Sequence, residues 1–353
     1  MIRKSLFFIA LFLVHFAVAQ YRIDRYDTSY YVSYRNKLNL GTVGVNKNIV
    51  FKMNAPDATK AIRYSANSPL KFGFSVNHDF ITLVGTVGLG KLDPGFKSEK
   101  GETRLINIQL GVIGRKVLAD IYFQNAQGLY TQPAQPAVAN SGQYYVRPDL
   151  KTKLYGSSVA IIDQHKKFSA QAAFLLDARQ KKSAGSLVYG ADFFYGTVKA
   201  DSAFVPSLLA DQYPHANVSS LQFFRFGPGI GYGHTFVILK QFFATAITSI
   251  NADLTQVKEW TVQGDVNKNW NFKPNLNLKG AAGYNTENWG ISFSYNTSRL
   301  FFSGIEADNR YLNNNDKFKL LFIQRIEPGH TIPKITRWGR KFLQQIGLGF
   351  LAN

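Results

Sequence analysis

Bulky apolar residues alternate with small polar residues along much of the chain, in segments of about ten residues. The clearest segment, 289–296, reads WGISFSYN and has its bulky residues at the odd positions. The same period runs through Leu70–Asn77, Ile106–Val112, Val117–Gln124, Phe168–Phe174, Leu187–Gly196 and Phe272–Tyr284. Successive side chains of a β-strand point to opposite faces, so each segment is predicted to be a strand with one bulky face and one small polar face.

The residue types on the two faces favour a membrane barrel over a soluble sandwich. The polar faces consist mainly of Gly, Ser, Asn and Gln, whereas the bulky faces are rich in Phe, Tyr and Ala. Small polar side chains suit a crowded wet interior, and aromatic side chains suit contact with lipid. Backbone groups in lipid need partners, so a spanning sheet must close on itself. The sequence therefore predicts an all-β fold, a closed antiparallel transmembrane β-barrel of about 12 strands, within a range of roughly 10 to 14.

The connections between these strands are expected to alternate between short periplasmic turns and long outer loops. Short connections are predicted at 113–116, 163–167, 179–183, 239–241 and 285–288. Long ones are predicted at 91–102, 127–148, 199–225, 253–271 and 303–316. The consecutive short connections at 163–167 and 179–183 break the alternation, so either one outer loop is tight or the strand between them is miscounted.

The two ends of the chain differ from its strand-rich middle. Residues 1–19 contain the basic Arg3 and Lys4, an apolar run, and the small residues Ala17 and Ala19, which together predict a cleaved secretory signal peptide. Residues 20–333 are predicted to form the barrel, which this export signal assigns to the outer membrane. Residues 334–353 form a basic amphipathic tail, which is either an interfacial helix or a final strand with a loose end.

The chain has a formal charge of +19 and no cysteine. The lack of cysteine excludes disulfides, thiolate metal sites and cysteine nucleophiles. The basic residues are scattered singly and form no Lys/Arg-rich run, so nucleic acid is not a predicted partner. Positive charge on an exported protein instead suits outer-membrane lipid, lipopolysaccharide phosphates and small anionic solutes. The alternative is that this charge only keeps the loops solvated.

The search for catalytic and metal-binding patterns is mostly negative. Segment 85–91 has the spacing of a phosphate-binding loop, but Leu92 stands where a hydroxyl residue is required, so we reject that interpretation. No histidine outside the signal peptide has a metal-ligand spacing, and neither a metal nor a cofactor is predicted. A barrel lipid hydrolase needs a His–Ser pair, and His234 is the candidate histidine. Its own strand face lacks a hydroxyl at the next position, which leaves a serine from a neighbouring strand as the open alternative.

Several short motifs resemble one family of barrels. The resembling positions are Arg147, Pro148 and Asp149 in YVRPDL, Arg179, Gln180, Ser183, Gly185 and Ser186 in RQKKSAGS, Asp201 and Pro206 in DSAFVPS, and Gly227, Gly229 and Gly231 in GPGIGY. From about Thr28 to Arg325 the chain resembles uncharacterised outer-membrane barrels from Bacteroidetes that are grouped as a domain of unknown function. The resemblance implies an outer-membrane barrel and no assigned activity.

The motifs also have physical interpretations. Gly227, Gly229 and Gly231 share one strand face, where the lack of Cβ atoms admits bulky neighbours or a bend. Arg147 and Asp149 are expected to pin a long loop through an ion pair, with solute binding as the alternative. The basic residues of RQKKSAGS are expected at a strand end, in a solvated turn or in contact with anionic groups.

The favoured function is a non-enzymatic outer-membrane barrel. It either conducts small hydrophilic or anionic solutes through a passive pore or acts as a structural surface protein. One alternative is a lipid-modifying enzyme that uses His234. Another is a barrel whose loops, 127–148 and 199–225, bind a partner protein or a glycan. The sequence leaves open whether the lumen is free or plugged.

Overall fold

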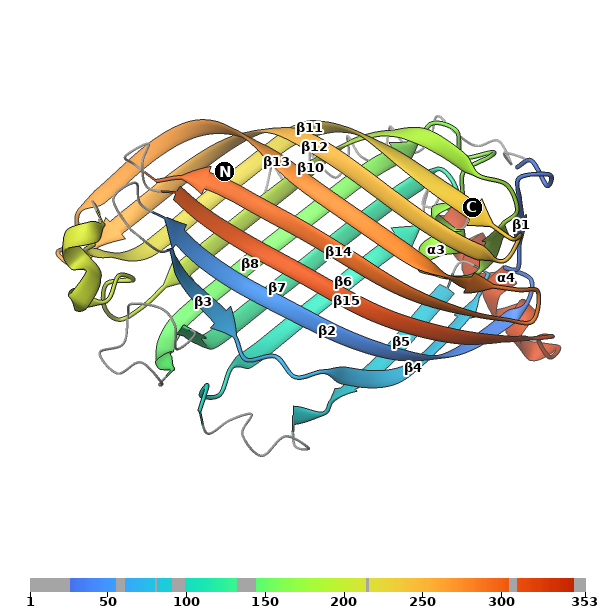
Figure 1. Ribbon diagram of the computed structural model, residues 1–353, viewed down its shortest axis with the longest axis horizontal. Coiled ribbons are helices and arrows are strands. Elements are labelled where there is room, and N and C mark those ends of the chain that lie inside the picture. Colours follow the sequence, from blue (N-terminus) through green and yellow to red (C-terminus); the bar gives the residue numbers. More distant parts are fainter. Residues whose placement is uncertain are drawn as a thin grey trace.

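The computed structural model describes residues 26–54, 61–79, 81–90, 99–131, 144–213, 216–304 and 310–345. These residues form an antiparallel β-barrel whose strands run obliquely to its long axis (Figure 1). The predicted signal peptide, residues 1–19, lies outside the described residues.

The wall consists mainly of long strands, and a few short elements lie at its ends. In chain order the strands are β1 (Tyr31–Ser33), β2 (Leu38–Asn54), β3 (Ile62–Ala66), β4 (Lys71–His78), β5 (Ile81–Gly88), β6 (Arg104–Ile113), β7 (Val117–Thr131), β8 (Tyr145–Ile162), β9 (Ala178–Gln180), β10 (Ala184–Lys199), β11 (Val218–Ile238), β12 (Phe242–Thr261), β13 (Val266–Asn285), β14 (Trp289–Ser303) and β15 (Arg310–Ile326). The helices are α3 (Ala170–Phe174), the 3₁₀ helix η2 (Ser207–Gln212) and α4 (Thr331–Gln345). No helix in the described part of the chain is long and apolar enough to cross a membrane.

The wall closes because its last strand pairs with β2. β15 and β2 are antiparallel and in register from Ile326↔Leu38 to Arg310↔Asn54. Ten strands complete the ring in the order β2, β15, β14, β13, β12, β11, β10, β8, β7 and β3. Strands β4, β5 and β6 extend the wall beside β2 and β7. The prediction of a closed antiparallel transmembrane barrel is confirmed.

The two faces of the wall have the predicted chemistry. In β14, Ile291 and Phe293 point outward and are exposed, whereas Ser292 and Ser294 point into the barrel and are buried. An exposed band of such apolar side chains is unfavourable in water and favourable in lipid. The small polar face therefore lines the lumen, and the bulky face is the membrane surface.

The predicted strand Phe168–Phe174 is wrong, because residues 170–174 form helix α3 inside the barrel. Ser169 is its N-cap, and the Ser169 Oγ atom accepts a hydrogen bond from the Ala172 N–H at 3.3 Å. The period of two at this point came from alanines, which are strong helix formers, and a serine cap fixes the helix start. The two short connections on either side are parts of one connection, residues 163–183, so β8 and β10 are consecutive antiparallel strands of the wall. Short and long connections do not alternate strictly, because the long connection 163–183 is followed by the long connection 200–217.

Four predicted long connections are shorter than expected, and those predicted at 127–148 and 303–316 are residues 132–144 and 304–309. β12 runs to Thr261 and β13 begins at Val266, so the connection predicted at 253–271 is only residues 262–265. The alternation of apolar and polar residues is not evident in these parts of β12 and β13, because outward-facing residues such as Gln256 and Lys258 are polar. Similarly, β10 and β11 extend into the connection predicted at 199–225, which shortens it to 200–217.

Both ends of the barrel are covered by chain that folds over the lumen. At one end, residues 200–213 and 216–217, called the cap, lie between β10 and β11 and carry η2 (Figure 1). At the other end, residues 163–183, called the plug, connect β8 to β10 and carry α3 and β9. β9 pairs with β1, and α4 lies at the same end as the plug (Figure 1). Of the C-terminal tail predicted at 334–353, residues up to Gln345 belong to helix α4, residues 346–353 lie outside the described residues, and an interfacial location of the helix stays a prediction.

Candidate functional site

Four lysines on the lumenal face of the wall, Lys47, Lys279, Lys317 and Lys319, form a cluster. Lys71 and Lys273 also lie on this face. Lys47 of β2 and Lys317 of β15 are cross-strand partners, so their side chains leave the wall at the same level. Lys319 follows on the same face of β15, and Lys279 of β13 is the cross-strand partner of Asn296 on the lumenal face of β14. Like charges directly opposite each other on neighbouring strands are destabilising. These four lysines, called the lysine cluster, therefore repel one another unless negative charge lies nearby.

The counter-charge within the protein is incomplete. Lys47 Nζ donates a hydrogen bond to Asn107 Oδ1, and Lys317 Nζ donates to Gln109 Oε1 at 3.2 Å. Lys279 Nζ pairs with Asp120 Oδ2 at 2.9 Å. Among the described residues, Asp120 is the one carboxylate that forms an ion pair with a lysine of the cluster. The excess positive charge makes this part of the lumen attractive to an anion.

The fourth lysine of the cluster connects it to the plug. Lys319 Nζ donates to the backbone carbonyl oxygen of Phe174, the last residue of α3, at 2.7 Å. A change in the charge around the cluster therefore acts directly on a contact that holds α3.

Buried polar atoms lie on the wall beside the cluster. The Oγ atoms of Ser292 and Ser294, and the Oδ1 atoms of Asn296 and Asn315, have no hydrogen-bond partner among the described residues. Buried polar groups normally have such a partner. The serine hydroxyls are donors that suit an anion, so the chemistry of this wall complements that of the lysines.

A second charged group lies farther along the lumen and contains charges of both signs, including the buried Asp192. Arg225 of β11 and Asp253 of β12 form an ion pair in which neither side chain is exposed. The Arg225 guanidinium also lies over the Phe194 ring, 5.9 Å from its centroid. Removal of Arg225 would leave buried carboxylates without compensation, so this pair is part of the wall's structure.

Two of the motifs meet at the cap. Arg147 and Asp149 form a two-pronged ion pair, with Nε–Oδ1 at 2.9 Å and Nη2–Oδ2 at 2.7 Å. Arg147 also donates to the carbonyl oxygen of Ala203 at 2.8 Å and to Ser202 Oγ at 3.0 Å. The Asp201 N–H donates to Asp149 Oδ2 at 3.1 Å. The expected Arg147–Asp149 pair is thus present, and the segment it holds is the cap.

The two prolines of these motifs lie at the start of a helix and within a strand. Pro206 stands directly before η2, and its carbonyl oxygen accepts a hydrogen bond from the Leu209 N–H at 2.9 Å. Pro148 is exposed on β8.

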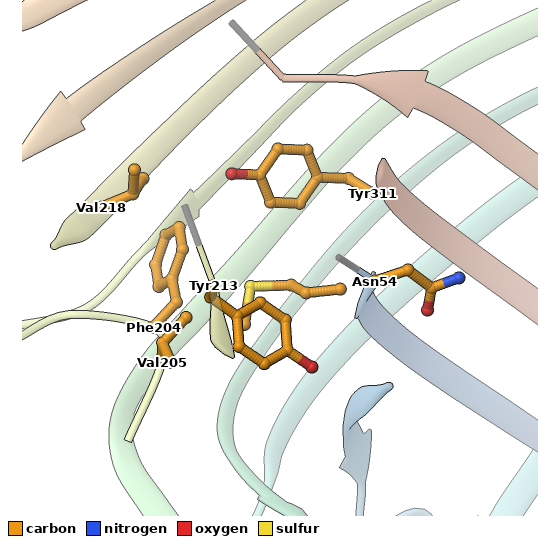
Figure 2. A pocket seen from close by; sticks show the side chains of 7 residues that line it. Asn54, Phe204, Val205, Tyr213, Val218 and Tyr311 are labelled. Carbon is orange, nitrogen blue, oxygen red and sulfur yellow. The ribbon is translucent and has the colours of Figure 1, made fainter. Parts of the chain in front are cut away.

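Apolar packing closes the lumen beneath the cap. Phe204 is buried among wall side chains, and its ring meets that of Phe51 edge-on with centroids 5.7 Å apart. Figure 2 shows a cavity between the cap and the wall, lined by Met53, Asn54, Phe204, Val205, Tyr213, Val218 and Tyr311. Its volume is about 10 Å³, which is close to the space that one water needs. This cavity is a small packing gap and is too small for a solute.

A third motif, RQKKSAGS, holds the plug. Gln180 Oε1 accepts a hydrogen bond from the Ser169 N–H at 3.0 Å. Its Nε2 donates to the carbonyl oxygens of Lys167 at 2.6 Å and Lys182 at 3.0 Å. One side chain therefore satisfies backbone groups on both sides of α3.

The other polar residues of this motif tie the plug to the wall. Ser186 Oγ accepts from the Gln164 N–H at 2.8 Å, and Ser183 Oγ accepts from the Val237 N–H at 2.9 Å. Arg179 lies 3.4 Å from the exposed Glu287. The motif residues thus stabilise the closed end and do not gather into a separate polar pocket.

The glycine motif lies on the lumenal face of β11. Gly227, Gly229 and Gly231 are cross-strand partners of inward-facing residues of β10. A Cβ atom at Gly229 would lie 2.6 Å from the Asn251 side chain. At Gly233, next on the same face, a Cβ atom would lie 2.9 Å from the Phe168 ring of the plug. The glycines thus leave room for bulky neighbours, as their spacing predicts.

His234 lies on the outer face of β11, in contact with Phe236 at 4.3 Å between ring centroids. Its cross-strand partners are Gly185 of β10 and Ala246 of β12. Neither partner has a hydroxyl, so the two neighbouring strands place no serine directly opposite His234. No cluster of metal-ligating side chains occurs in the described part of the chain.

One buried carboxyl group lies in the plug, outside the wall strands. Burial raises the pKa of Asp177 to about 7, although the guanidinium groups of Arg35, Arg325 and Arg115 favour its charged form. Arg325 also donates to the carbonyl oxygen of Leu176 and, at 2.7 Å, to Asn285 Oδ1. The plug end therefore contains a group that titrates near neutral pH.

Comparison with known families identifies the chain. The family model described as "Domain of unknown function (DUF4421)" matches residues 25–322. The chain belongs to the DUF4421 family. This finding confirms the resemblance to a domain of unknown function, and the taxonomic origin stays a prediction. No curated protein matches this DUF4421 chain.

Solved outer-membrane proteins resemble the DUF4421 chain only distantly. OmpT of Vibrio cholerae has 7% identity and a TM-score of 0.27, over 82% of this chain and 98% of its own. Neisserial surface protein A has 9% identity and a TM-score of 0.23, over 80% and 95%. The Pseudomonas putida toluene transporter TodX has 8% identity and a TM-score of 0.27, over 82% and 89%. These likenesses carry no argument about function.

The lysine cluster of this DUF4421 barrel was not predicted from the sequence. Its members come from β2, β13 and β15, which meet only when the wall closes. A signal was nevertheless present, because Lys279 stands on the small polar face of its strand together with Asn275 and Asn277. A lysine on the lumenal face is more informative than the net charge of the chain.

Proposed function

We propose that this DUF4421 protein is an outer-membrane barrel that binds a small anionic solute at its lysine cluster and passes it when the plug moves. The observation that supports the proposal is the pair Lys47 and Lys317, directly opposite each other on the lumenal face. A bound anion would relieve their repulsion and accept hydrogen bonds from the hydroxyls of Ser292 and Ser294. Because the cap and the plug cover both ends, the proposal is gated passage rather than a permanently open pore.

In this proposal the plug end faces the periplasm. The connections at that end include the short turns 239–241 and 286–288, and short turns are typical of the periplasmic side. Outward basic residues near the cap end then meet the outer leaflet, where they suit lipopolysaccharide phosphates; they are Lys151, Lys153, Lys258, Lys268 and Arg299.

Ion selectivity in a planar bilayer tests the proposal. The lumen is first opened at both ends by replacement of plug residues 168–180 and cap residues 202–212 with Gly/Ser linkers, and the reversal potential is measured in an asymmetric salt gradient. We expect anion preference, and we expect Lys47→Gln with Lys317→Gln to reduce it strongly. Lys268→Gln is the matched control, because Lys268 is exposed on the outer face of β13. Cation preference, or no response to the double substitution, would contradict the proposal.

The two alternative functions stay hypotheses. Partner binding through the connection 199–225 has less surface than expected, because Phe204, Val205 and Leu209 of the cap are buried. A lipid hydrolase that uses His234 requires a hydroxyl that its direct cross-strand partners do not supply. Unchanged lipid hydrolysis in His234→Ala would exclude that histidine as a catalytic residue.

A further inference from the structure

The wall of the barrel is continuous at the cap end and divided toward the plug end. β3 joins β7 through only two residue pairs, Ser65↔Tyr130 and Ala66↔Leu129. Beyond them the wall continues as β2–β4–β5 on one side and as β7–β6 on the other. β5 pairs only with β4, and β6 pairs only with β7, among the described residues. The facing free edges of β5 and β6 are called the seam.

Specific hydrogen bonds fix the point where the wall divides. The Asn67 N–H donates to Thr103 Oγ1 at 2.8 Å, and Asn67 Nδ2 donates to the Gly101 carbonyl oxygen at 2.9 Å. Thr103 Oγ1 in turn donates to the carbonyl oxygen of Gly128. Gly128 has a φ of +82° and lies where the β7–β8 register shifts, a position that favours glycine. The seam therefore begins at a point that the sequence specifies.

Exposure shows that the inner faces of the edge strands β5 and β6 are accessible along the seam. Ser75 of β4 and Val84 of β5 are cross-strand partners on the lumenal face. Ser75 is 6% exposed, whereas Val84 is 55% exposed. Gln109, on the lumenal face of β6, is exposed as well.

The lysine cluster lies directly behind the seam. Lys47 and Lys317 make their hydrogen bonds to Asn107 and Gln109, and both acceptors belong to the edge strand β6. On the outer face of the same edges, Leu83, Ile106 and Ile108 are each more than half exposed. Cationic groups thus lie on the lumenal side of the seam, and apolar side chains lie on its outer side.

We propose that the seam admits the acyl chain of an anionic amphiphile, whose head group binds the lysine cluster while its chain extends into the bilayer. This inference rests on the proposed function and names its substrate class as a carboxylate or phosphate on an acyl or alkyl chain. A charged head group needs the lysines, and an apolar chain gains by leaving the polar lumen for lipid.

Binding of chains of different length tests the substrate class. Calorimetry on the barrel in nanodiscs, with empty nanodiscs as the blank, compares butyrate, dodecanoate and dodecyl phosphate. We expect both long-chain compounds to bind at least tenfold more tightly than butyrate, and Lys47→Gln with Lys317→Gln to weaken all three. Comparison of the two long-chain compounds shows whether a carboxylate or a phosphate is preferred. If dodecanoate and dodecyl phosphate bind no more tightly than butyrate does, the inference of an amphiphilic substrate is wrong, but the proposed anion binding still stands. If none binds, the proposed function fails with it.

A bridge across the seam tests the route. The chain has no cysteine, so Leu83→Cys with Ile108→Cys introduces one thiol on each side, to be joined by a bifunctional maleimide. Val76→Cys with Leu83→Cys is the matched control, because these two residues are already cross-strand partners within the β4–β5 pair. Heat-modifiable migration on a gel verifies that each variant is folded. We expect the bridge across the seam to weaken dodecanoate binding at least tenfold and to leave butyrate binding unchanged. Equal dodecanoate binding in the bridged seam and the control would overturn the inference.

Discussion

The cap and the plug close the same lumen by different means. The cap is held by apolar packing, with Phe204, Val205 and Leu209 buried against the wall and one ion pair, Arg147–Asp149, above them. The plug also has an apolar part, but its backbone is held by side chains such as Gln180 and Lys319, which donate hydrogen bonds to its carbonyl oxygens.

This difference indicates which end moves. Separation of the cap from the wall exposes apolar surface, and the wet lumen offers nothing in return. The hydrogen bonds of the plug can be exchanged for bonds to water at a small net loss. One of them comes from Lys319 of the lysine cluster, so a bound anion competes for the donor that holds α3. We therefore expect a bound anion to loosen the plug before the cap, although complete removal of α3 from the lumen would also expose Phe168, Phe174 and Leu176.

The largest effect is expected from a cavity in the cap. Phe204 is 1% exposed, and Phe204→Ala should lower the free energy of unfolding by about 3–5 kcal/mol. The measurement is urea-induced unfolding followed by tryptophan fluorescence. Leu208→Ala is the control, since Leu208 belongs to the same cap but is 64% exposed. Equal losses in the two variants would show that the cap does not contribute through packing.

Removal of the hydrogen-bonding side chain in the plug should have the next largest effect. Gln180→Ala leaves backbone groups of Ser169, Lys167 and Lys182 without partners, at a cost of about 2–3 kcal/mol. We expect faster tryptic cleavage within residues 163–183, while the barrel keeps its heat-modifiable migration. Gln164→Ala, at an exposed plug position, serves as the control. Unchanged trypsin resistance in Gln180→Ala would mean that other contacts hold the plug.

A conservative change in the cap ion pair should have a smaller effect. Lysine at position 147 keeps the charge but loses the two-pronged geometry and the fork that reaches Ala203 and Ser202. We expect Arg147→Lys to cost about 1–2 kcal/mol of unfolding free energy, measured as for Phe204→Ala. A larger loss of unfolding free energy in Arg147→Lys than in Phe204→Ala would show that the ion pair stabilises the cap more than its apolar packing does.

The sequence predicts the wall better than it predicts the two ends. In the wall, each residue sees lipid on one side and the lumen on the other, so the period of two is direct, as in β14. Inside the plug, Phe168 and Phe174 are buried against the barrel on all sides, and the contrast between faces that marks a strand has no meaning there. The motifs found at 147–149 and 179–186 proved to hold the cap and the plug. The lysine cluster depends on the closure of β15 onto β2, which no local pattern shows.

The smallest expected effect is a pH dependence of stability. It is expected in the plug and not in the cap, because Asp177 lies in the plug. Burial raises the pKa of its carboxyl group to about 7, while an unfolded chain has the ordinary value of 3.8. The folded plug therefore keeps a proton that the unfolded chain releases, so stability is highest below the ordinary value and is lost as the pH rises toward 7. Between pH 6 and pH 7.5 the loss is about 1 kcal/mol. Tryptic cleavage of the plug, normalised to cleavage of an unstructured peptide at the same pH, should accelerate over this range, and Asp177→Asn should make the normalised rate independent of pH. Asp163→Asn, at an exposed plug position, should retain the wild-type profile. If Asp177→Asn also retains it, the titration belongs to another group, and the plug has no pH response of its own.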